Sequence, residues 1–289
     1  MNNLFLFIIP CLIWGSTWLV IKFQLGVVDP MVSVFYRFLL AGILLLAYCK
    51  IRGLNLKFSI KQHMFMFLLG SLLFSINYWL VYIAELSLAS GLVAVVFSSL
   101  IFLNTFNGAI FLKSKIRKNV LFSAVIGFIG IALIFRDEIF SFHFSNIESI
   151  ALLLAVISSL AASLGNITSA YNQRNGLPII QTNAFGMIYG SLLMMVIAIA
   201  TGQQFNFDFS FAYISSLLYL SVFGSIIAFA SYLTLIGKIG ADKTAYITLV
   251  VPVIALALST VFEGYQWTAI AFLGLTLILA GNTLVLSKK

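Results

Sequence analysis

Long apolar stretches follow one another along almost the whole of this 289-residue chain. Each is bounded by charged residues, Gly, Pro or Asn, and none shows the strict alternation of apolar and polar positions that a membrane β-barrel needs. About 20 apolar residues suffice for a helix to cross a bilayer. The pattern predicts ten transmembrane helices, at residues 4–24, 31–49, 63–86, 89–112, 119–135, 148–172, 179–201, 211–236, 242–262 and 267–286.

The composition supports a protein that is embedded in lipid. Hydrophobic residues make up 62% of the chain and charged residues only 8%, too few polar side chains to cover a water-soluble fold. In lipid, backbone groups must be satisfied within helices or a closed barrel. Because the barrel pattern is absent, we expect an all-α integral protein of the cytoplasmic membrane.

The net charge of +8 is concentrated on one side of the predicted membrane domain. If the N-terminus is cytoplasmic, 13 of the 16 Lys and Arg residues fall at cytoplasmic helix ends. Arg136 alone lies on the opposite side, while Lys22 and Arg37 lie within helices. Basic residues in short loops accumulate on the cytoplasmic side. The asymmetry predicts that both termini are inside, and it favours a positive-inside collar over a nucleic-acid-binding surface.

The second half of the chain repeats spacings found in the first half. Matching residues recur about 150 positions apart, namely Pro30 and Pro178, Gly42 and Gly190, Ala89 and Ala241, and Gly130 and Gly281. Because five helices per half is an odd number, the second half must enter the membrane from the opposite side. We therefore expect two inverted five-helix repeats in one membrane domain, at 1–140 and 147–289. Inverted repeats are typical of secondary transporters, whose substrate site lies near the midplane between the halves.

Several motifs stand in a fixed order along the chain. They are Trp14 to Lys22 (Trp-Gly-Ser-Thr-Trp-Leu-Val-Ile-Lys), Pro30, Tyr36 to Gly42, Tyr82 to Glu85, Ser90 to Ala94, Val250 to Val253, Phe262-Glu263 and Gly274 to Gly281. This ordered set resembles the EamA-type members of the drug/metabolite transporter superfamily over nearly the whole chain. The resemblance implies a ten-helix carrier that works by alternating access, often as an exporter of amino acids, metabolites or toxic compounds.

The fourth helix departs from the pattern of that family. Leu100 or Ile101 stands where the family usually has Pro, and residues 111–113 (Phe-Leu-Lys) stand where its Glu usually closes the helix. The second half keeps both features, as Pro252 and Glu263. Because, of these two matched helices, only the ninth has lost a backbone donor, we expect a gating weak point at Pro252. For Glu263 we expect a role at the rim or at a helix end.

Charged side chains within the predicted helices are candidates for function. Arg37 lies roughly 10 Å into the second helix at 1.5 Å per residue, and such a charge forms a structural ion pair or marks a substrate path. Glu85 could pair with Arg37 or Lys22, bind a substrate amine, carry a proton, or lie exposed at the outer rim. Lys22 is placed either to snorkel to water or to act in gating. Our sharpest hypothesis is that Arg37 and Glu85 together form the charged part of the substrate path.

Aromatic and amide side chains supply the other candidates for a substrate-binding wall. For each of them the alternative is ordinary packing or interhelical hydrogen bonding. The aromatic candidates are Trp14, Tyr78, Tyr82, Tyr232 and Tyr246, and the amide candidates are Asn77, Asn104 and Asn166.

Other classes of function find little support in the sequence. Cys11 and Cys49 give neither a disulfide framework nor a metal-ligand spacing. His63 and His143 stand at helix ends or in loops, and the sequence has no HExxH motif, nucleophile elbow or P-loop. We predict a non-enzyme without cofactor or metal, whose partners are a small-molecule substrate, lipid and, as a candidate coupling ion, protons. The alternatives are a receptor or assembly subunit and a facilitator for a drug or sugar derivative.

The charge asymmetry generates a test of topology. Cysteines placed at Lys57, Lys115 and Lys289 should be shielded from an impermeant thiol reagent added outside the cell, because these positions belong to the predicted cytoplasmic collar. Cysteines at Phe142 or Phe207 should react. Robust labelling from outside at Lys57 or Lys115 would overturn the inside assignment.

Overall fold

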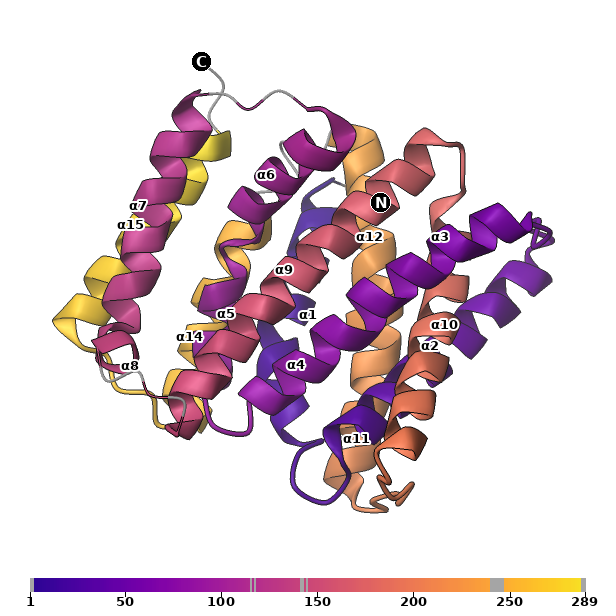
Figure 1. The fold of residues 1–289 in the computed structure, drawn as a ribbon, viewed down its shortest axis with the longest axis horizontal. Helices are drawn as coiled ribbons and strands as arrows, with labels where there is room; N and C mark the ends of the chain where they lie inside the picture. The colour runs from indigo at the N-terminus through magenta and orange to yellow at the C-terminus, as the bar shows by residue number, and fades with distance from the viewer. Residues whose placement is uncertain are drawn as a thin grey trace.

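The computed structural model describes residues 3–114, 116, 118–140, 143, 145–239 and 247–286, and every regular element in these ranges is helical (Figure 1). The first half contains α1 (Asn3–Lys22), α2 (Pro30–Ile51), α3 (Ile60–Ser71), the π-helix η1 (Leu72–Ile76), α4 (Asn77–Ala84), α5 (Ser90–Phe97), α6 (Leu100–Leu112), α7 (Lys118–Ile134) and α8 (Arg136–Phe140). The second half contains α9 (Ile147–Arg174), α10 (Ile179–Ala200), α11 (Phe211–Tyr219), the π-helix η2 (Leu220–Ile227), α12 (Ala228–Ile239), α14 (Ile247–Phe262) and α15 (Ala269–Leu286).

Most of these helices have the length and composition of membrane spans. Seven stretches are long and apolar enough to cross a bilayer, at Asn3–Lys22, Pro30–Ile51, Ile60–Ala84, Ser90–Leu112, Ile147–Arg174, Ile179–Ala200 and Phe211–Tyr232. Three further apolar helices are shorter, at 121–134, 250–262 and 269–284. Large apolar side chains such as Phe5, Phe122 and Phe272 are exposed on the surface of the bundle. Together these features indicate a helical membrane protein.

The two halves interleave instead of forming separate bundles. α7 lies along α15, α2 along α10, and α5 along α14. α1 contacts α12 and α14, while α9 contacts α3, α4, α5 and α6. Figure 1 shows α7 with α15 at one edge of the molecule and α2 with α10 near the other. The core therefore consists largely of contacts between residues far apart in sequence.

The helix predicted over 89–112 is interrupted between α5 and α6, which corrects the prediction of one continuous helix. Ser98 and Ser99 form a turn in which each backbone N–H donates to a carbonyl three residues earlier. Serine hydroxyls can compete for the backbone groups of a helix, and the Ser98 hydroxyl donates to the carbonyl of Val95 in α5. The amide of Asn282 on α15 donates to the Ser98 carbonyl at 3.5 Å. By contrast, α14 continues through Pro252.

Two π-helical segments were not predicted from the sequence. η1 joins α3 to α4, and η2 joins α11 to α12. π-Helical turns shift the register of the helical hydrogen bonds and are frequent at functional sites. Phe74 and Ser75 of η1 and Ser221 and Ser225 of η2 are fully buried. Both segments therefore belong to the core.

Close approach of the halves depends on glycines where helices cross. A Cβ atom at Gly130 on α7 would lie 2.6 Å from the carbonyl oxygen of Gly274 on α15, and a Cβ at Gly274 would lie 2.6 Å from that of Gly130. A Cβ at Gly70 on α3 would lie 2.2 Å from the carbonyl oxygen of Gly186 on α10. Small residues let helix backbones approach in this way inside membranes.

We predict that Gly130→Ala lowers the melting temperature of the purified protein. The opposing atom belongs to the backbone and cannot rotate away, and overpacking of this kind costs about 1–3 kcal/mol. Gly108→Ala on α6 is the matched control, because the nearest atom to its added Cβ is 3.7 Å away. Replacing a helix-interior glycine there should stabilise the protein by about 0.5–1 kcal/mol. A melting temperature of Gly130→Ala equal to or above that of Gly108→Ala would show that the proposed packing is wrong.

Candidate functional site

Among the Lys and Arg residues that the structure describes, the most deeply buried is Arg37 in α2, of which 1% is exposed. Its Nε donates to the hydroxyl of Ser225 at 3.4 Å and its Nη1 donates to the hydroxyl of Tyr82 at 3.5 Å. The guanidinium carbon lies 4.5 Å from the centre of the Tyr78 ring and 5.1 Å from that of Phe38. Cation–π contacts at desolvated sites are worth about 2 kcal/mol. Two long hydrogen bonds use only part of the five N–H donors of an arginine.

The π-helix η2 supplies the second-half partners of this site. The Ser221 hydroxyl donates to the main-chain carbonyl of Arg37 at 3.0 Å, and Ser225 accepts from the guanidinium. A Cβ at Gly224 would lie 3.3 Å from Nη2 of Arg37. The Gly224 carbonyl accepts from Nε1 of Trp14 at 3.2 Å. We call Arg37 with its contacts Tyr78, Tyr82, Ser221 and Ser225 the Arg37 cluster.

Sequence reasoning missed most of the groups that hold Arg37. Gln24, whose side-chain oxygen accepts from the Tyr82 hydroxyl at 2.9 Å, lies in a connection between helices. Ser221 and Ser225 are four residues apart and therefore share a helix face, which was the one signal available. Their role depends on η2, which hydropathy does not reveal.

Glu85 is fully buried at the end of α4 and makes no ion pair with Arg37. The ion pairs among the described residues are Lys22 with Glu263 and Arg136 with Asp137. The hypothesis of direct pairing is therefore corrected, because hydroxyls and ring faces contact Arg37 instead. The expectation of an exposed rim position for Glu85 is also wrong.

The Glu85 carboxyl lies in a polar region without forming hydrogen bonds. It interacts electrostatically with Lys22, Glu263 and Arg37. Neither of its carboxylate oxygens has a hydrogen-bond partner among the residues that the structure describes. Burying an ionised carboxylate without partners is costly. Such a group is suited to hold a proton or to receive a donor from a ligand.

Lys22 connects the two halves at one end of the bundle. Its Nζ lies 3.6 Å from Oε1 of Glu263 and donates to the main-chain carbonyls of Glu85 and of Leu88, the latter at 2.7 Å. The C-terminal end of a helix favours a cation, and these carbonyls follow α4. The ammonium is therefore bound by protein oxygens while 27% of the side chain is exposed, so the expectation that Lys22 snorkels to water stays a prediction.

The Glu263 carboxylate caps the first turn of α5. Both of its oxygens accept from the backbone N–H of Ser90 at 3.1 Å, and the hydroxyls of Ser90 and Ser259 also donate to it. Burial by itself raises the pKa of Glu263, but the hydrogen bonds from Ser259 and Ser90, together with Lys22, hold that pKa below its usual range. Because α5 has no side-chain cap of its own, a carboxylate from the second half satisfies a helix end of the first half. We call Lys22, Ser90, Ser259 and Glu263 the latch.

The aromatic candidates are partly gathered around the Arg37 cluster. The ring of Trp14 packs against Phe229 at 5.2 Å and Tyr232 at 5.3 Å, measured between ring centroids. Tyr78 and Tyr82 contact Arg37 directly. Tyr246 lies outside the described residues.

The amide candidates form hydrogen bonds between or within helices, which is the structural alternative stated for them above. Nδ2 of Asn166 on α9 donates to Oδ1 of Asn104 on α6 at 3.4 Å, which is an interhelical hydrogen bond. Asn77 is buried and donates to the carbonyl of Leu73 one turn earlier, at 3.1 Å. The Oδ1 atom of Asn77 has no partner among the described residues.

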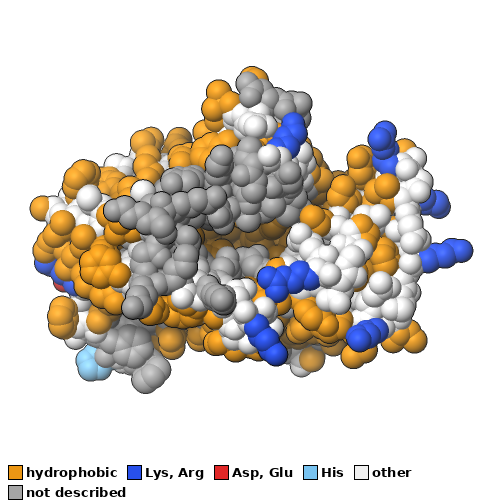
Figure 2. Space-filling model, turned by 90° about the horizontal axis from the view of Figure 1, so that it is seen from above, with side chains coloured by type: hydrophobic (Ala, Val, Ile, Leu, Met, Phe, Trp, Pro, Cys, Tyr) orange, Lys and Arg blue, Asp and Glu red, His pale blue; other side chains and the backbone are white. Residues whose placement is uncertain are grey.

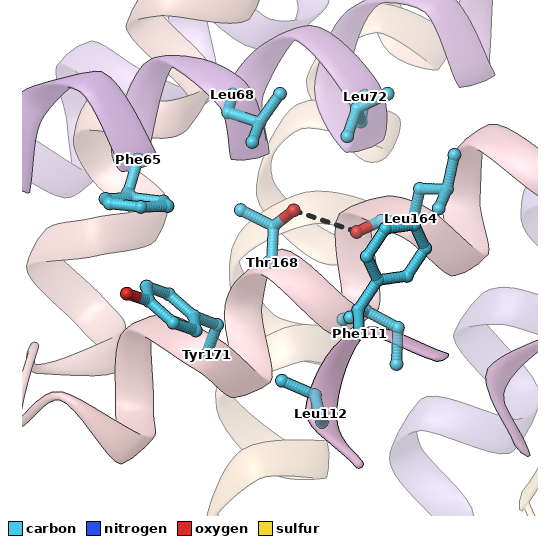
Figure 3. Close-up of a pocket in the computed structure, with 9 residues that line it drawn as sticks. Phe65, Leu68, Leu72, Phe111, Leu112, Leu164, Thr168 and Tyr171 are labelled. Carbon is cyan, nitrogen blue, oxygen red and sulfur yellow. Dashed lines mark hydrogen bonds between the residues drawn. The ribbon is translucent and has the colours of Figure 1, made fainter. Parts of the chain in front are cut away.

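A separate cavity of about 370 Å³ lies between α3, α6 and α9 (Figure 3). Side chains from α3 and its continuation η1, from α6 and from α9 line it. Its lining residues are Phe65, Leu68, Leu72, Phe111, Leu112, Leu164, Ile167, Thr168 and Tyr171. The Thr168 hydroxyl donates to the carbonyl of Leu164 in its own helix at 2.9 Å, so the wall is almost entirely apolar. We call this cavity the α3–α6–α9 groove; it contains no residue of the Arg37 cluster.

Comparison with known proteins gives consistent matches along the chain. The sequence model of the EamA-like transporter family matches residues 1–136 and again 149–287. An uncharacterized inner membrane transporter of Escherichia coli, YedA, is 29% identical over 281 residues, which cover 96% of this chain and 88% of that protein. An uncharacterized transporter of Bacillus subtilis, YvbV, is 28% identical over 96% of this chain and 89% of its own length. Protein PagO of Salmonella typhimurium is 25% identical over 90% and 84% of the two chains.

A solved crystal structure shares the fold. It superposes with a TM-score of 0.69 over 98% of this chain and 95% of its own, at 16% sequence identity. The family and the relatives indicate a membrane transporter, and the fold likeness agrees with the helical arrangement described above.

Glu263→Gln should lower the melting temperature by several degrees, because it removes the charge that caps α5 and pairs with Lys22. Hydrogen bonds to charged groups contribute about 1.5–3 kcal/mol each. Since the pKa of Glu263 is lowered on folding, its contribution is complete above the usual glutamate pKa and is lost as the pH falls through the lowered value. The wild type should therefore lose more stability than Glu263→Gln on acidification through that window.

The matched control is Glu148→Gln, which alters an exposed carboxylate in the first turn of α9. It should leave the melting temperature almost unchanged. Melting curves of Glu263→Gln that coincide with the wild type at every pH would show that the latch contributes nothing to stability.

Proposed function

This chain belongs to the EamA-like transporter family, and from that premise we propose that it is a secondary transporter of the cytoplasmic membrane that exports a small metabolite, an amino acid or related compound, by alternating access. The observation that carries the proposal is the guanidinium of Arg37, buried between the halves without a carboxylate partner in the described part of the chain. A guanidinium suits a substrate carboxylate. The carboxyl of Glu85, which accepts no hydrogen bond from the described residues, suits a substrate amine or a proton, and the two groups together suit a zwitterion.

Two inverted repeats, residues 1–140 and 147–289, are part of the proposal. The two separate matches to the family support them. The helix contacts support them as well. The first helix of one repeat contacts the third and fourth helices of the other: α1 packs on α12 and α14, and α9 packs on α4 and α6. The two fifth helices, α7 and α15, pack on each other. Residues 151 apart in the chain occupy equivalent positions, so Gly130 corresponds to Gly281 and Gly274 to Ser123. The contact between Gly130 and Gly274 is accordingly repeated between Gly281 and Ser123, where an added Cβ on Gly281 would lie 2.8 Å from the Ser123 carbonyl oxygen. Seven long spans and three shorter apolar helices fit ten crossings.

We place both termini on the cytoplasmic side. Figure 2 views the molecule from above Figure 1: among the described side chains on this face, Lys and Arg gather over the right-hand half and hardly any acidic one is seen. That distribution supports the positive-inside orientation. The latch then lies at the outer end of the bundle.

In this orientation the latch holds the outer end closed, and Lys22 acts in gating. The position equivalent to Glu263 in the first half, 152 residues earlier, is Phe111, whose side chain cannot cap a helix. The inner end therefore lacks a matching carboxylate at that position. Pro252 is the second gating residue, because the missing donor lets α14 bend. The serine turn between α5 and α6 offers a weak point in the first half.

The test is flux into proteoliposomes across a panel of amino acids and related metabolites, with and without a pH gradient. Arg37→Lys keeps the charge but loses the bidentate fork, and flux should fall at least about tenfold, as expected for the loss of about 1.5–3 kcal/mol of charge-assisted hydrogen bonding. Glu85→Gln should flatten the dependence of flux on external pH. Arg52→Lys, an exposed arginine at the end of α2, is the matched control and should transport normally.

Three outcomes contradict parts of the proposal. Absence of flux for every compound would favour the receptor or assembly-subunit alternative. Flux of drugs or sugar derivatives alone would show that the substrate is not an amino acid or a related metabolite. Normal flux in folded Arg37→Lys and Glu85→Gln proteins with lowered melting temperatures would make the two charges structural.

A further inference from the structure

We propose that the α3–α6–α9 groove binds an acyl chain of an anionic phospholipid whose headgroup is held at the rim by Arg174 and Lys113. The site is distinct from the Arg37 cluster. The proposal depends neither on the identity of the substrate nor on the direction of transport.

The shape and chemistry of the groove fit a hydrocarbon chain. Its volume of about 370 Å³ lies in the range of about 300–1,000 Å³ typical of small-molecule sites. Ligand sites for polar compounds carry several convergent polar groups, whereas the side-chain hydroxyls of this lining are those of Thr168, already bonded within α9, and of Tyr171. The wall continues onto the lipid-facing surface, because Phe111 is 60% exposed and Leu68 is 43% exposed. A lipid can therefore enter sideways from the bilayer.

The rim of the groove is cationic. Arg174 is in the last turn of α9, three residues after the lining residue Tyr171, and its Nη1 donates to the carbonyl of Leu112 at 3.2 Å. Lys113 directly follows Leu112 and is exposed, with a left-handed backbone (φ 56°) that ends α6. Two cations thus lie beside the two lining residues at one end of the groove.

The surrounding sequence strengthens the preference for an anion. Lys115, Arg117 and Lys118 follow Lys113 in the chain. α3 and α6 contain no Asp or Glu, and α9 has only Glu148, in its first turn, at the end remote from Arg174. Basic clusters next to membrane helices attract anionic headgroups. A phosphate at the rim would satisfy the guanidinium while the chain occupies the groove.

The experiment measures lipid binding by the purified full-length protein in neutral detergent. Phosphatidylglycerol and phosphatidylcholine with identical acyl chains are added, and melting temperature and retained lipid are measured, the latter by native mass spectrometry. We expect phosphatidylglycerol to be retained and to raise the melting temperature by several degrees more than phosphatidylcholine. Inorganic phosphate, which has the headgroup charge without the chain, should not stabilise the protein.

Two sets of variants separate the headgroup from the chain. Arg174→Gln with Lys113→Gln should weaken phosphatidylglycerol binding by about tenfold or more, while Arg174→Lys should retain it. The control pair Arg52→Gln with Lys57→Gln makes the same change of charge away from the groove and should bind normally.

Leu68→Trp should fill the groove and reduce retention of both lipids. Leu44→Trp is its control, on α2 at 40% exposure, and should leave retention unchanged. Equal stabilisation by the two lipids would overturn the headgroup assignment, as would an equal loss of binding in the Arg52 and Lys57 pair. Unaltered retention in Leu68→Trp would overturn the placement of the chain.

Discussion

The arrangement of this protein depends on one constraint, a permanently charged guanidinium inside a membrane-embedded core. Such a charge costs about 2.5–3.5 kcal/mol even on insertion scales. Arg37 is accommodated by groups from both halves, with Tyr82 on one side and Ser225 on the other. The halves cannot separate at this level unless water or a ligand replaces those contacts. This requirement links the interface between the halves to the proposed binding of substrate.

The rest of the interface divides into rigid and adjustable parts. Where Gly130 and Gly274 meet, backbone lies against backbone, and little sliding is possible without a clash. The latch is different, because Glu263 holds α5 through hydrogen bonds and Lys22 of α1 through an ion pair, and these contacts can break and re-form. The latch and the Arg37 cluster are polar contacts at the end and in the middle of the bundle, whereas its edges are closely packed. This arrangement fits a structure in which movement is confined to particular helices.

The sequence predicted the helices better than the contacts of their side chains. Helix ranges follow from apolar length, a property of each segment alone, and so the described helices fall within a few residues of the predicted ranges. The burial of Glu85, its failure to meet Arg37 and the contribution of Gln24 depend on how helices distant in sequence cross. The π-helix η2 and the turn at Ser98 arise from competing hydrogen bonds that hydropathy does not register. The geometry of the site could therefore not be predicted from the sequence.

We infer that Arg37 serves transport and not stability. The most direct measurement combines melting temperature and flux on one preparation of Arg37→Met. Arg37 has no carboxylate partner among the described residues, so replacing it by an apolar side chain of similar length removes the cost of burying the charge without leaving an opposite charge unpaired. We expect a folded protein that melts near or above the wild type and has lost flux. A protein that melts far below the wild type, but whose folded fraction transports at the normal rate, would contradict this inference.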